Sequence, residues 1–338
     1  MMHLTAARFS SVIAGLLLLL LASALLGLVL GPSALSFGDV VAALSQDEGA
    51  AADIVWRIRV PRIALAALVG ACLSVAGVVF QALLRNPLAD PFILGVSGGA
   101  ALGGIAMLSL GGLLGLGYAA VPPAAFGGAV VTTVLLYLVA GRRGRVSAAN
   151  LLLTGVVFNA FASAAIVFLA SAAGLTEGAR IFLWLVGNLS AARLDVAPWL
   201  VVFLGVGFTA AVALSRSLNV LALGDEAAEH LGVPVASQQR ILLLATSLMG
   251  GAAVAVAGLV GCVGLIIPHL LRLILGPDHR LLVPAAALGG AAFLVLCDTA
   301  ARTLLGGREL PVGAITAIVG GPLFLALLRR HHLQVLAR

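Results

Sequence analysis

Lysine is absent from this sequence, and charge of either sign is scarce. The 338 residues include 19 basic residues, all of them arginine, and 13 acidic residues, so only 9% of the chain is charged. A soluble domain usually carries about 25% charged residues. The chain is 62% hydrophobic and its mean hydropathy is +1.19. Because water could not solvate a fold with this much apolar surface, a lipid bilayer must be the solvent for much of it.

The sequence also lacks the motifs of several enzyme and binding classes. Without lysine it cannot form a Walker A phosphate-binding loop, so another chain must bind ATP if ATP drives this protein. It contains no HExxH, CxxC or paired-carboxylate motif, so nothing predicts a cofactor or a catalytic residue in this chain. The arginines are scattered between apolar runs rather than gathered in a basic helix, which argues against nucleic-acid binding.

Few residues could hold a metal. Cys72, Cys262 and Cys297 are far apart and each lies in an apolar run, which is typical of small buried residues rather than of a disulfide or zinc site. His269 follows Pro268 in an apolar segment. A lone histidine there could be a metal ligand, but a hydrogen-bonded packing residue is the favoured interpretation.

Long runs without charge mark the candidate membrane helices, because a spanning helix needs about 20 apolar residues. The first run is longer than a typical signal-peptide core, which favours a retained helix over a cleaved leader. The runs cover residues 9–38, 63–84, 91–141, 146–176, 196–215, 241–271, 281–297 and 310–328.

Two of these runs are too long for a single helix. Glycines between Gly111 and Gly117, followed by Pro122-Pro123, divide the run 91–141 into two helices. Gly261, Gly264 and Pro268 divide the run 241–271 into a full helix and a short one that reaches about residue 275. The sequence therefore predicts an all-α integral membrane protein with ten transmembrane helices in a single domain over residues 1–338.

Small residues recur at every fourth position in two of these segments. Ala66, Gly70 and Ser74 form one such series, and Gly95, Gly99 and Gly103 form another. Small faces let helix backbones approach closely in lipid, where no hydrophobic force drives helices together. Both series predict close helix packing, although 41 glycines in an apolar chain also create such spacings by chance.

Ten helices would place both termini on the same side of the membrane. With both termini in the cytoplasm, twelve arginines fall on the inner side and seven on the outer side, as the positive-inside rule favours. The seven outer arginines are Arg57, Arg59, Arg62, Arg180, Arg193, Arg302 and Arg308.

Ionisable residues within the apolar runs are few. Asp298 and Arg302 lie one helical turn apart, so they could pair on one face of a helix. A carrier driven by a proton or sodium gradient would normally place several carboxylates at mid-membrane. This chain offers one such carboxylate, near the end of a run, which favours energy coupling from outside the membrane.

Two inner loops are unusual. In residues 85–91, two prolines bracket a short polar turn and predict a rigid corner at the membrane surface. The second loop, 216–239, contains acidic residues at the start of a short helix and a glycine, Gly232, that would end it. Leu223, Ala227 and Leu231 form an apolar stripe on this helix. Such a helix suits a protein groove or a lipid surface, and its acidic face favours a protein partner.

These segments resemble the iron-chelate and vitamin B12 (FecCD-type) permease family of ABC importers. The resemblance runs from about residue 56 to 328. It rests on Arg59-Val60-Pro61-Arg62, Leu68-Val69-Gly70-Ala71, Gln81, the loop 85–91, Leu94-Gly95-Val96-Ser97-Gly98-Gly99-Ala100, the segment 264–272, Asp278-His279-Arg280, Glu309-Leu310-Pro311-Val312-Gly313 and Thr316-Ala317.

The resemblance implies a type II ABC importer permease fold in the bacterial cytoplasmic (inner) membrane, with membrane lipid around it. It implies a homodimer that encloses one pathway, with two cytosolic ATPase subunits that bind ATP and Mg. It also implies a periplasmic or lipid-anchored binding protein that docks on the outer face. Family members carry ferric siderophores, haem or cobalamin. A ferric siderophore or haem is favoured over cobalamin here, and the binding protein is expected to choose the substrate.

The resemblance also implies roles for particular residues. The loop that couples to the ATPase contains Leu223, Gly224, Glu226, Ala227, Leu231 and Gly232. The arginines that dock the binding protein are Arg59, Arg62 and Arg302, with Asp298 positioning Arg302; the alternative for Arg59 and Arg62 is snorkelling to the membrane surface. The cytosolic gate contains Asn86, Leu88, Ala148 and Ala149, and the two alanines depart from the hydroxyl residues frequent in the family. Thr154 and Asn159 are expected to line the pathway.

Two other classes of protein stay open at this point. A secondary carrier or channel that works alone would show inverted repeats and mid-membrane carboxylates, and neither is visible. An intramembrane enzyme would need a nucleophile with its base or a metal motif, and neither is visible in the sequence.

Overall fold

The computed structural model describes residues 5–33, 35–45, 49–111, 115–142, 145–172, 174–190, 194–305 and 309–336. In these ranges the chain is all-α apart from one antiparallel pair of two-residue strands, β1 (Gly141–Arg142) and β2 (Arg145–Val146). The helices are α1 (Ala6–Val29), α2 (Phe37–Ser45), α3 (Ala50–Asp53), η1 (Ile54–Arg59), α4 (Val60–Leu83), α5 (Val96–Leu110), η3 (Tyr118–Ala120), α6 (Val121–Ala140), α7 (Ala148–Ala172), α8 (Gly174–Leu185), η4 (Leu194–Val196), α9 (Ala197–Ala213), α10 (Ser215–Leu221), α11 (Asp225–His230), α12 (Val235–Ala257), α13 (Val263–Leu275), α14 (His279–Thr303) and α15 (Val312–Leu336).

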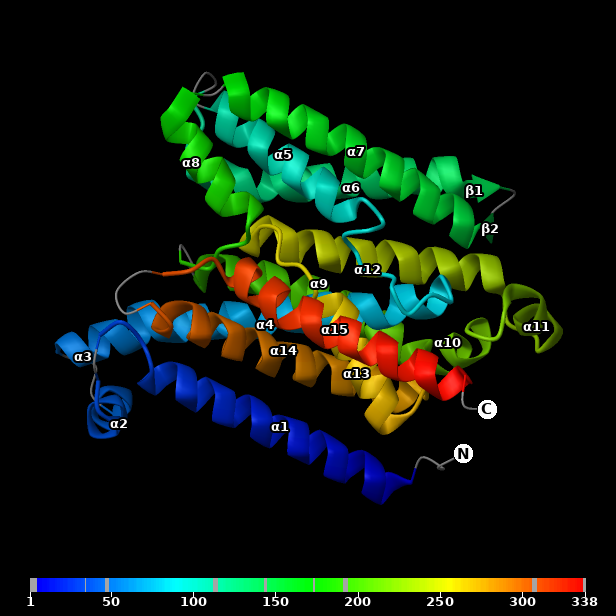
Figure 1. Cartoon of the computed structure of the whole chain (residues 1–338), viewed down its shortest axis with the longest axis horizontal. Helices are drawn as coiled ribbons and strands as arrows, with labels where there is room; N and C mark the ends of the chain where they lie inside the picture. The colour runs from blue at the N-terminus through cyan, green and yellow to red at the C-terminus, as the bar shows by residue number, and fades with distance from the viewer. Residues whose placement is uncertain are drawn as a thin grey trace.

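The long helices lie side by side along the longest axis of the molecule (Figure 1). Both chain termini, the β1–β2 pair, α10 and α11 lie at one end, here called the α11 end. The opposite end, here called the α2 end, holds α2, α3 and α8. This arrangement is that of a helical bundle whose two ends could face the two sides of a membrane.

Seven helical segments of the described chain are long and apolar enough to cross a membrane. They are Ala6–Val29, Ala50–Leu83, Tyr118–Ala140, Ala148–Ala172, Leu194–Ala213, Val235–Ala257 and His279–Thr303. The apolar helices Val96–Leu110, Val263–Leu275 and Val312–Leu323 are shorter. The division of the runs 91–141 and 241–271 into two helices each is therefore confirmed. The break in the second run lies at residues 258–262, however, so Gly264 and Pro268 lie inside α13 and do not divide the run as predicted. At about 1.5 Å per residue the 15-residue α5 is about 22 Å long, shorter than a hydrocarbon core of about 30 Å, so the count of ten spans stays a prediction.

Helices α4, α12 and α14 form the core of the bundle. In the most apolar 18-residue stretch of each of these helices, between 72% and 78% of the residues are buried. The corresponding share is 11% for α1, 17% for the α9 segment and 22% for α7. A helix that is apolar all round is stable only inside a protein or in lipid. The outer helices therefore face lipid or another protein chain.

Glycines bring α4 into backbone contact with its neighbours. A Cβ atom at Gly70 would collide with the carbonyl of Gly290 on α14, and one at Gly77 would collide with the carbonyl of Gly264. On α5, a Cβ at Gly99 or Gly103 would collide with α6 in the same way. Both predicted small-residue faces are thus packing faces.

Another residue of α4, Gln81, supplies a hydrogen bond that a proline in α13 cannot make. Pro268 has no N–H to give to the carbonyl of Gly264 four residues earlier. The amide nitrogen of Gln81 on α4 lies 3.4 Å from that carbonyl oxygen and 3.1 Å from the carbonyl oxygen of Leu265, and donates to both. Gln81 is 2% exposed, so this bond replaces a helix bond where water is scarce.

Candidate functional site

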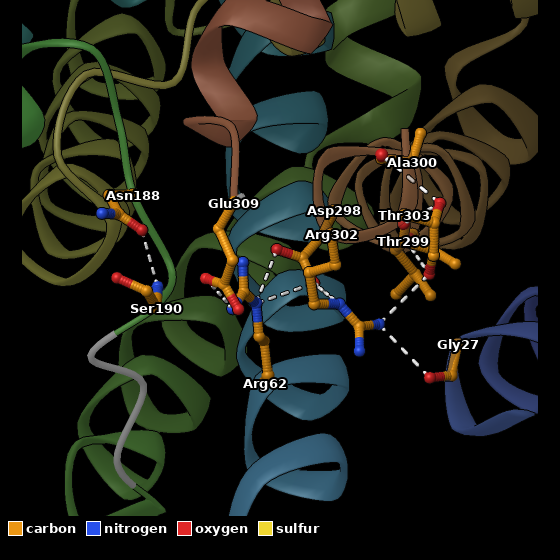
Figure 2. A network of polar contacts seen from close by, with 11 residues as sticks. Gly27, Arg62, Asn188, Ser190, Asp298, Thr299, Ala300, Arg302, Thr303 and Glu309 are labelled. Carbon is orange, nitrogen blue, oxygen red and sulfur yellow. Dashed lines mark hydrogen bonds and ion pairs between the residues drawn. The ribbon is translucent and has the colours of Figure 1, made fainter. Parts of the chain in front are cut away.

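A network of buried charges joins three segments at the α2 end (Figure 2). Arg62 Nε on α4 lies 2.9 and 3.0 Å from the two carboxylate oxygens of Asp298 on α14. Arg62 Nη1 donates to Glu309 Oε2, before α15, at 2.8 Å. Arg302 Nε forms an ion pair with Asp298 Oδ2 at 3.1 Å. The predicted pairing of Asp298 with Arg302 is confirmed, whereas the pairing of Arg62 with both Asp298 and Glu309 was not foreseen.

The charges in this network balance. The side chains of Arg62, Arg302 and Asp298 are 4%, 3% and 1% exposed, and that of Glu309 is 39% exposed. An unpaired charge would be very unfavourable at such burial, so two arginines and two acids in contact are the arrangement that burial requires. Arg302 Nη2 also donates to the carbonyl of Gly27 on α1 at 3.2 Å. The network therefore holds α1, α4, α14 and the start of α15 together.

Arg59 closes the end of α1. Its guanidinium donates to the carbonyls of Leu28, Val29 and Ser33, the last two at 3.0 and 2.6 Å. The last carbonyls of a helix have no partner within the helix and carry partial negative charge, so a cation there is favourable. Arg59 thus fixes the loop after α1 against the start of α4.

The three arginines predicted to dock a binding protein lie at the α2 end, but inside the protein. Arg59, Arg62 and Arg302 are 2%, 3% and 3% exposed, and each has partners in this chain. A snorkelling side chain would keep its charged head in water, so that alternative for Arg59 and Arg62 is wrong. A docking partner would reach these guanidinium groups only by displacing an internal partner, and the docking role stays a prediction.

The predicted short helix at the opposite end is α11. Gly224, with φ of +124°, precedes it, and Gly232, with φ of +79°, follows it. The N–H of Gly232 bonds to the carbonyl of Glu229 and that of Val233 to the carbonyl of Ala228, which is the Schellman ending of a helix. The predicted stop at Gly232 is confirmed.

The predicted apolar stripe is not on α11 as a whole: Leu223 precedes its N-cap, Ala227 lies within it and Leu231 is its C-cap. The two flanking leucines face outward. Leu223 is 71% and Leu231 is 66% exposed, while Ala227 between them is half-buried and Glu226 is exposed. Two exposed leucines at one end of the bundle are apolar surface that none of the described residues covers. Such surface is typical of a contact with another protein.

Side chains attach α11 to the bundle. Asp225 accepts a hydrogen bond from Gln239 Nε2 on α12 at 3.2 Å. Its carboxylate also lies 4.0 Å from Arg85 Nη2, just after α4. A force on α11 would therefore act on α4 and α12 as well.

The predicted gate residues lie at the α11 end, in two groups. Asn86 is half-buried and its side-chain oxygen accepts from the N–H of Leu88 at 2.9 Å, which stiffens the turn; Leu88 is 38% exposed. Ala148 lines a small cavity with Leu84 at the end of α4, and Ala149 is exposed. Both groups border the end of α4, and the gate itself stays a prediction.

Of the two predicted pathway residues, Asn159 has a structural contact. Its Nδ2 donates to the carbonyl of Phe92 at 2.7 Å and so holds the segment before α5 against α7. Thr154 is half-buried. The open surface of α7 is apolar instead, with Leu153, Val157, Phe161 and Phe168 between 62% and 73% exposed.

Among the described residues, no group of three or more His, Cys, Asp or Glu could hold a metal ion. His269 is 8% exposed inside α13, and the three cysteines are free thiols. A cavity of about 460 Å³ lies at the α2 end between α4, α6, α12 and the segment after α8, with Tyr118, Trp184, Asn188 and Asp195 among its lining residues. The described chain thus presents a buried charge network, an exposed apolar surface beside α11 and long apolar helix faces, as a membrane permease would.

Comparison with known proteins agrees with this class. The sequence profile of the FecCD transport family matches residues 18–330. The chain therefore belongs to the FecCD transport family. The resemblance drawn from its motifs is thus confirmed.

Relatives in this family carry different substrates. The chain is 45% identical to the cobalamin import system permease protein BtuC of Halobacterium salinarum, over 84% of this chain and 75% of that protein. It is 43% identical to the hemin transport system permease protein HmuU of Yersinia pestis, over 83% and 86%. A solved structure described as an inward-facing metal-chelate type ABC transporter matches with a TM-score of 0.83 at 30% identity, covering 95% of this chain and 99% of that one.

Membership of this family defines the chain as the multi-pass permease subunit of an ABC importer for metal chelates, vitamin B12 or haem. The ATPase that drives such an importer is a separate subunit, and a binding protein is a further partner that the family implies. A carrier working without an ATPase, the alternative drawn from the sequence, is inconsistent with this membership.

Proposed function

We propose that this chain moves a bulky metal chelate, a ferric siderophore or haem, from the outside to the cytoplasm, driven by ATP hydrolysis on two partner ATPase subunits. The observation that carries this proposal is α11 with the two exposed leucines that flank it, Leu223 and Leu231, which offer a partner an apolar surface tied to α4 and α12. Cobalamin is the second candidate, because the cobalamin relative at 45% identity stands beside the hemin relative at 43%.

In this proposal the α11 end lies in the cytoplasm. Both termini lie at that end (Figure 1), as an even number of membrane crossings such as ten requires. The arginine distribution along the chain supports the same orientation in the inner membrane.

The working unit is proposed to be a homodimer with the pathway between its two copies. The apolar face of α7, with Leu153, Val157, Phe161 and Phe168 exposed, supports this, because the described part of a single chain leaves it uncovered. Thr154 of α7 would face the substrate, and Asn86, Leu88, Ala148 and Ala149 would close the pathway on the cytoplasmic side. A wide, weakly polar pathway suits a large chelate that the binding protein has already selected.

The binding protein is proposed to dock at the α2 end through Arg59, Arg62 and Arg302. Their two roles, docking and internal support, predict different results for the glutamine variants Arg59→Gln, Arg62→Gln and Arg302→Gln. Because all three arginines are buried and bonded within the chain, each variant is expected to lower the melting temperature whichever role holds. Docking predicts in addition that capture of the binding protein is lost in variants that still assemble with the ATPase. Capture that persists in those variants would contradict docking and leave internal support as the role.

The substrate is tested by uptake into vesicles that contain the permease with its ATPase and binding protein, with ATP enclosed on the ATPase side. Haemin, a ferric hydroxamate siderophore and cyanocobalamin are offered separately, and accumulation is measured with and without ATP. The proposal predicts ATP-dependent accumulation of haemin or the siderophore. Accumulation of cyanocobalamin alone would establish the second candidate instead.

A further inference from the structure

The segment Asp278-His279-Arg280, at the start of α14, has no role in the function proposed so far. It lies at the α11 end, in contact with α10, the short helix that leads into α11. Asn219 of α10 makes the contact. Its Nδ2 donates to Asp278 Oδ1 at 2.9 Å, and its Oδ1 accepts from the backbone N–H of His279 at 2.8 Å and lies 2.7 Å from His279 Nδ1.

The orientation of the Asn219 amide follows from its partners. The bonded Arg280 holds the pKa of Asp278 well below its usual range, so the Asp278 carboxylate is ionised and can only accept a hydrogen bond. The backbone N–H of His279 can only donate one. Asn219 must therefore turn its NH₂ group to Asp278 and its oxygen to His279, and His279 Nδ1 carries the proton that points at that oxygen.

This contact is buried where it meets α14. His279 is 3% exposed, and Asp278 is the N-cap of α14, accepting from the N–H of Arg280 at 3.1 Å. Asn219 therefore binds the first turn of α14 at both the cap residue and the first helical residue. Four residues further along the chain is Leu223, the first exposed leucine of the coupling surface.

The far end of the same helix lies in the buried charge network. Helix α14 has 25 residues, about 37 Å at 1.5 Å per residue, and ends beside Asp298 and Arg302. It is mostly buried and packs on α4 through Gly70 and Gly290. A displacement of its first turn would therefore reach the network that joins Arg62 with Glu309 in front of α15.

We propose that Asn219 is a positioning residue that transmits movement of α11 to α14, and through α14 to the charge network at the α2 end. This inference rests on the proposed function, in which an ATPase moves α11. Asp225, Gln239 and Arg85 attach α11 to α12 and α4, whereas Asn219 attaches the coupling segment to α14. Assembly with the ATPase depends on the exposed leucines and not on Asn219.

The hydrogen-bond pattern provides a test by exchange of two side chains of equal size. Asn219→Asp keeps the acceptor for His279 but places a second carboxylate against Asp278. Asp278→Asn alone still accepts from Asn219 and still caps α14, so it is the matched control. In the double variant Asn219→Asp/Asp278→Asn, the amide of residue 278 donates to the carboxylate of residue 219, which restores the bond between the two side chains. The N-cap bond from the N–H of Arg280 uses the same Asp278 oxygen that faces Asn219, so the double variant loses that bond.

The first measurement is the amount of substrate accumulated per ATP hydrolysed, in vesicles that contain the permease, its ATPase and its binding protein. The substrate is whichever of haemin, ferric hydroxamate and cyanocobalamin the unmodified permease accumulates. Asn219→Asp is expected to assemble with the ATPase but to lower this ratio at least about tenfold, the size expected from losing one or two buried hydrogen bonds. Asp278→Asn is expected to stay within about twofold of the unmodified ratio, and the double variant to recover a large part of it, since the bond between side chains 219 and 278 is present in both. An unchanged ratio in Asn219→Asp, or a double variant as poor as the single one, would overturn the proposal.

A second measurement does not depend on the substrate. Leu304, just after α14, is 63% exposed and can be replaced by cysteine in a variant without the native cysteines. The rate of its modification by a water-soluble maleimide is measured with and without ATP on the assembled ATPase. Asn219→Asp should abolish the effect of ATP on this rate, and the double variant should restore it; an effect that persists in Asn219→Asp refutes the role of Asn219. If the unmodified complex responds to ATP here but accumulates none of the three chelates, the substrate proposal fails and the inference on Asn219 stands.

Discussion

At the scale of single residues, Asp298 is the centre of the α2 end. It lies between Arg62 and Arg302 with its side chain 1% exposed, so its charge offsets both guanidinium groups. Glu309 adds a fourth charge at the edge, with 39% of its side chain exposed. Removing Asp298 leaves two buried guanidinium groups uncompensated, whereas removing Glu309, which is itself in contact with water, leaves Arg62 still paired with Asp298.

The two acids should therefore differ in their effect on stability. Asp298→Asn is expected to destabilise the protein by about 3–5 kcal/mol, because two buried arginines lose their shared carboxylate. Glu309→Gln, the control, is expected to cost about 1 kcal/mol or less. Thermal unfolding of the detergent-purified protein measures both. Equal losses in the two variants would show that the network does not centre on Asp298.

At the scale of elements, α11 is a short helix whose stability comes from its ends. Gly224 and Gly232 have positive φ values, and the Schellman bonds close its last turn. Six helical residues could not persist alone in water, so the bonds from Gln239 and the nearby Arg85 keep α11 in place on the bundle. Its exposed leucines are then presented as a fixed surface.

A charge on this surface should prevent assembly with the ATPase. Leu231→Glu replaces one of the two exposed leucines of the apolar contact with a carboxylate, and a bulky charged residue at Ala227 places a charge between them. Ser237→Glu adds the same charge at an exposed position of α12 near the same end and is the control. Co-purification of the ATPase is expected to be lost in Leu231→Glu and kept in Ser237→Glu. An intact, transporting complex in Leu231→Glu would refute the coupling role of α11.

At the scale of the whole molecule, the two ends of the bundle differ in what they offer. The α11 end holds the exposed leucines and both termini, and the α2 end holds the buried charge network and the cavity of about 460 Å³. Helices α4, α12 and α14 form the buried core between the two ends. A permease that an ATPase drives at one end and that takes up substrate at the other needs two ends with different surfaces.

The orientation can be measured in intact cells. In a variant without native cysteines, Leu231→Cys on the α11 end should resist a membrane-impermeant maleimide until the cells are opened. Leu304→Cys at the α2 end should react in intact cells, since its side chain is 63% exposed. The opposite pattern, or equal reactivity at both positions, would contradict the proposed orientation.

How much of this structure the sequence predicts depends on how far apart in the chain the interacting residues are. The end of α11 at Gly232 and the pairing of Asp298 with Arg302 are local, four residues or fewer apart, and helical geometry is enough to predict them. Arg62 and Asp298 are 236 positions apart, and Gln81 and Gly264 are 183 apart. No periodicity links such pairs.

The three arginines of the predicted docking site show what sequence separation hides. Their motif predicts that Arg59, Arg62 and Arg302 lie at one end of the bundle, and they do. Their burial depends on Asp298, Glu309 and the last carbonyls of α1, which come from three other segments. For the same reason Asn159 could be expected on α7, but its bond to the carbonyl of Phe92 could not.

The central claim is that this chain forms the pathway and a partner supplies the energy through α11. Chelate uptake is measured in two sets of vesicles, one with this chain alone under a proton or sodium gradient, and one with the chain, its ATPase, its binding protein and ATP. The account predicts uptake in the second set alone, and loss of that uptake in Leu231→Glu. Gradient-driven uptake by the chain alone would contradict it.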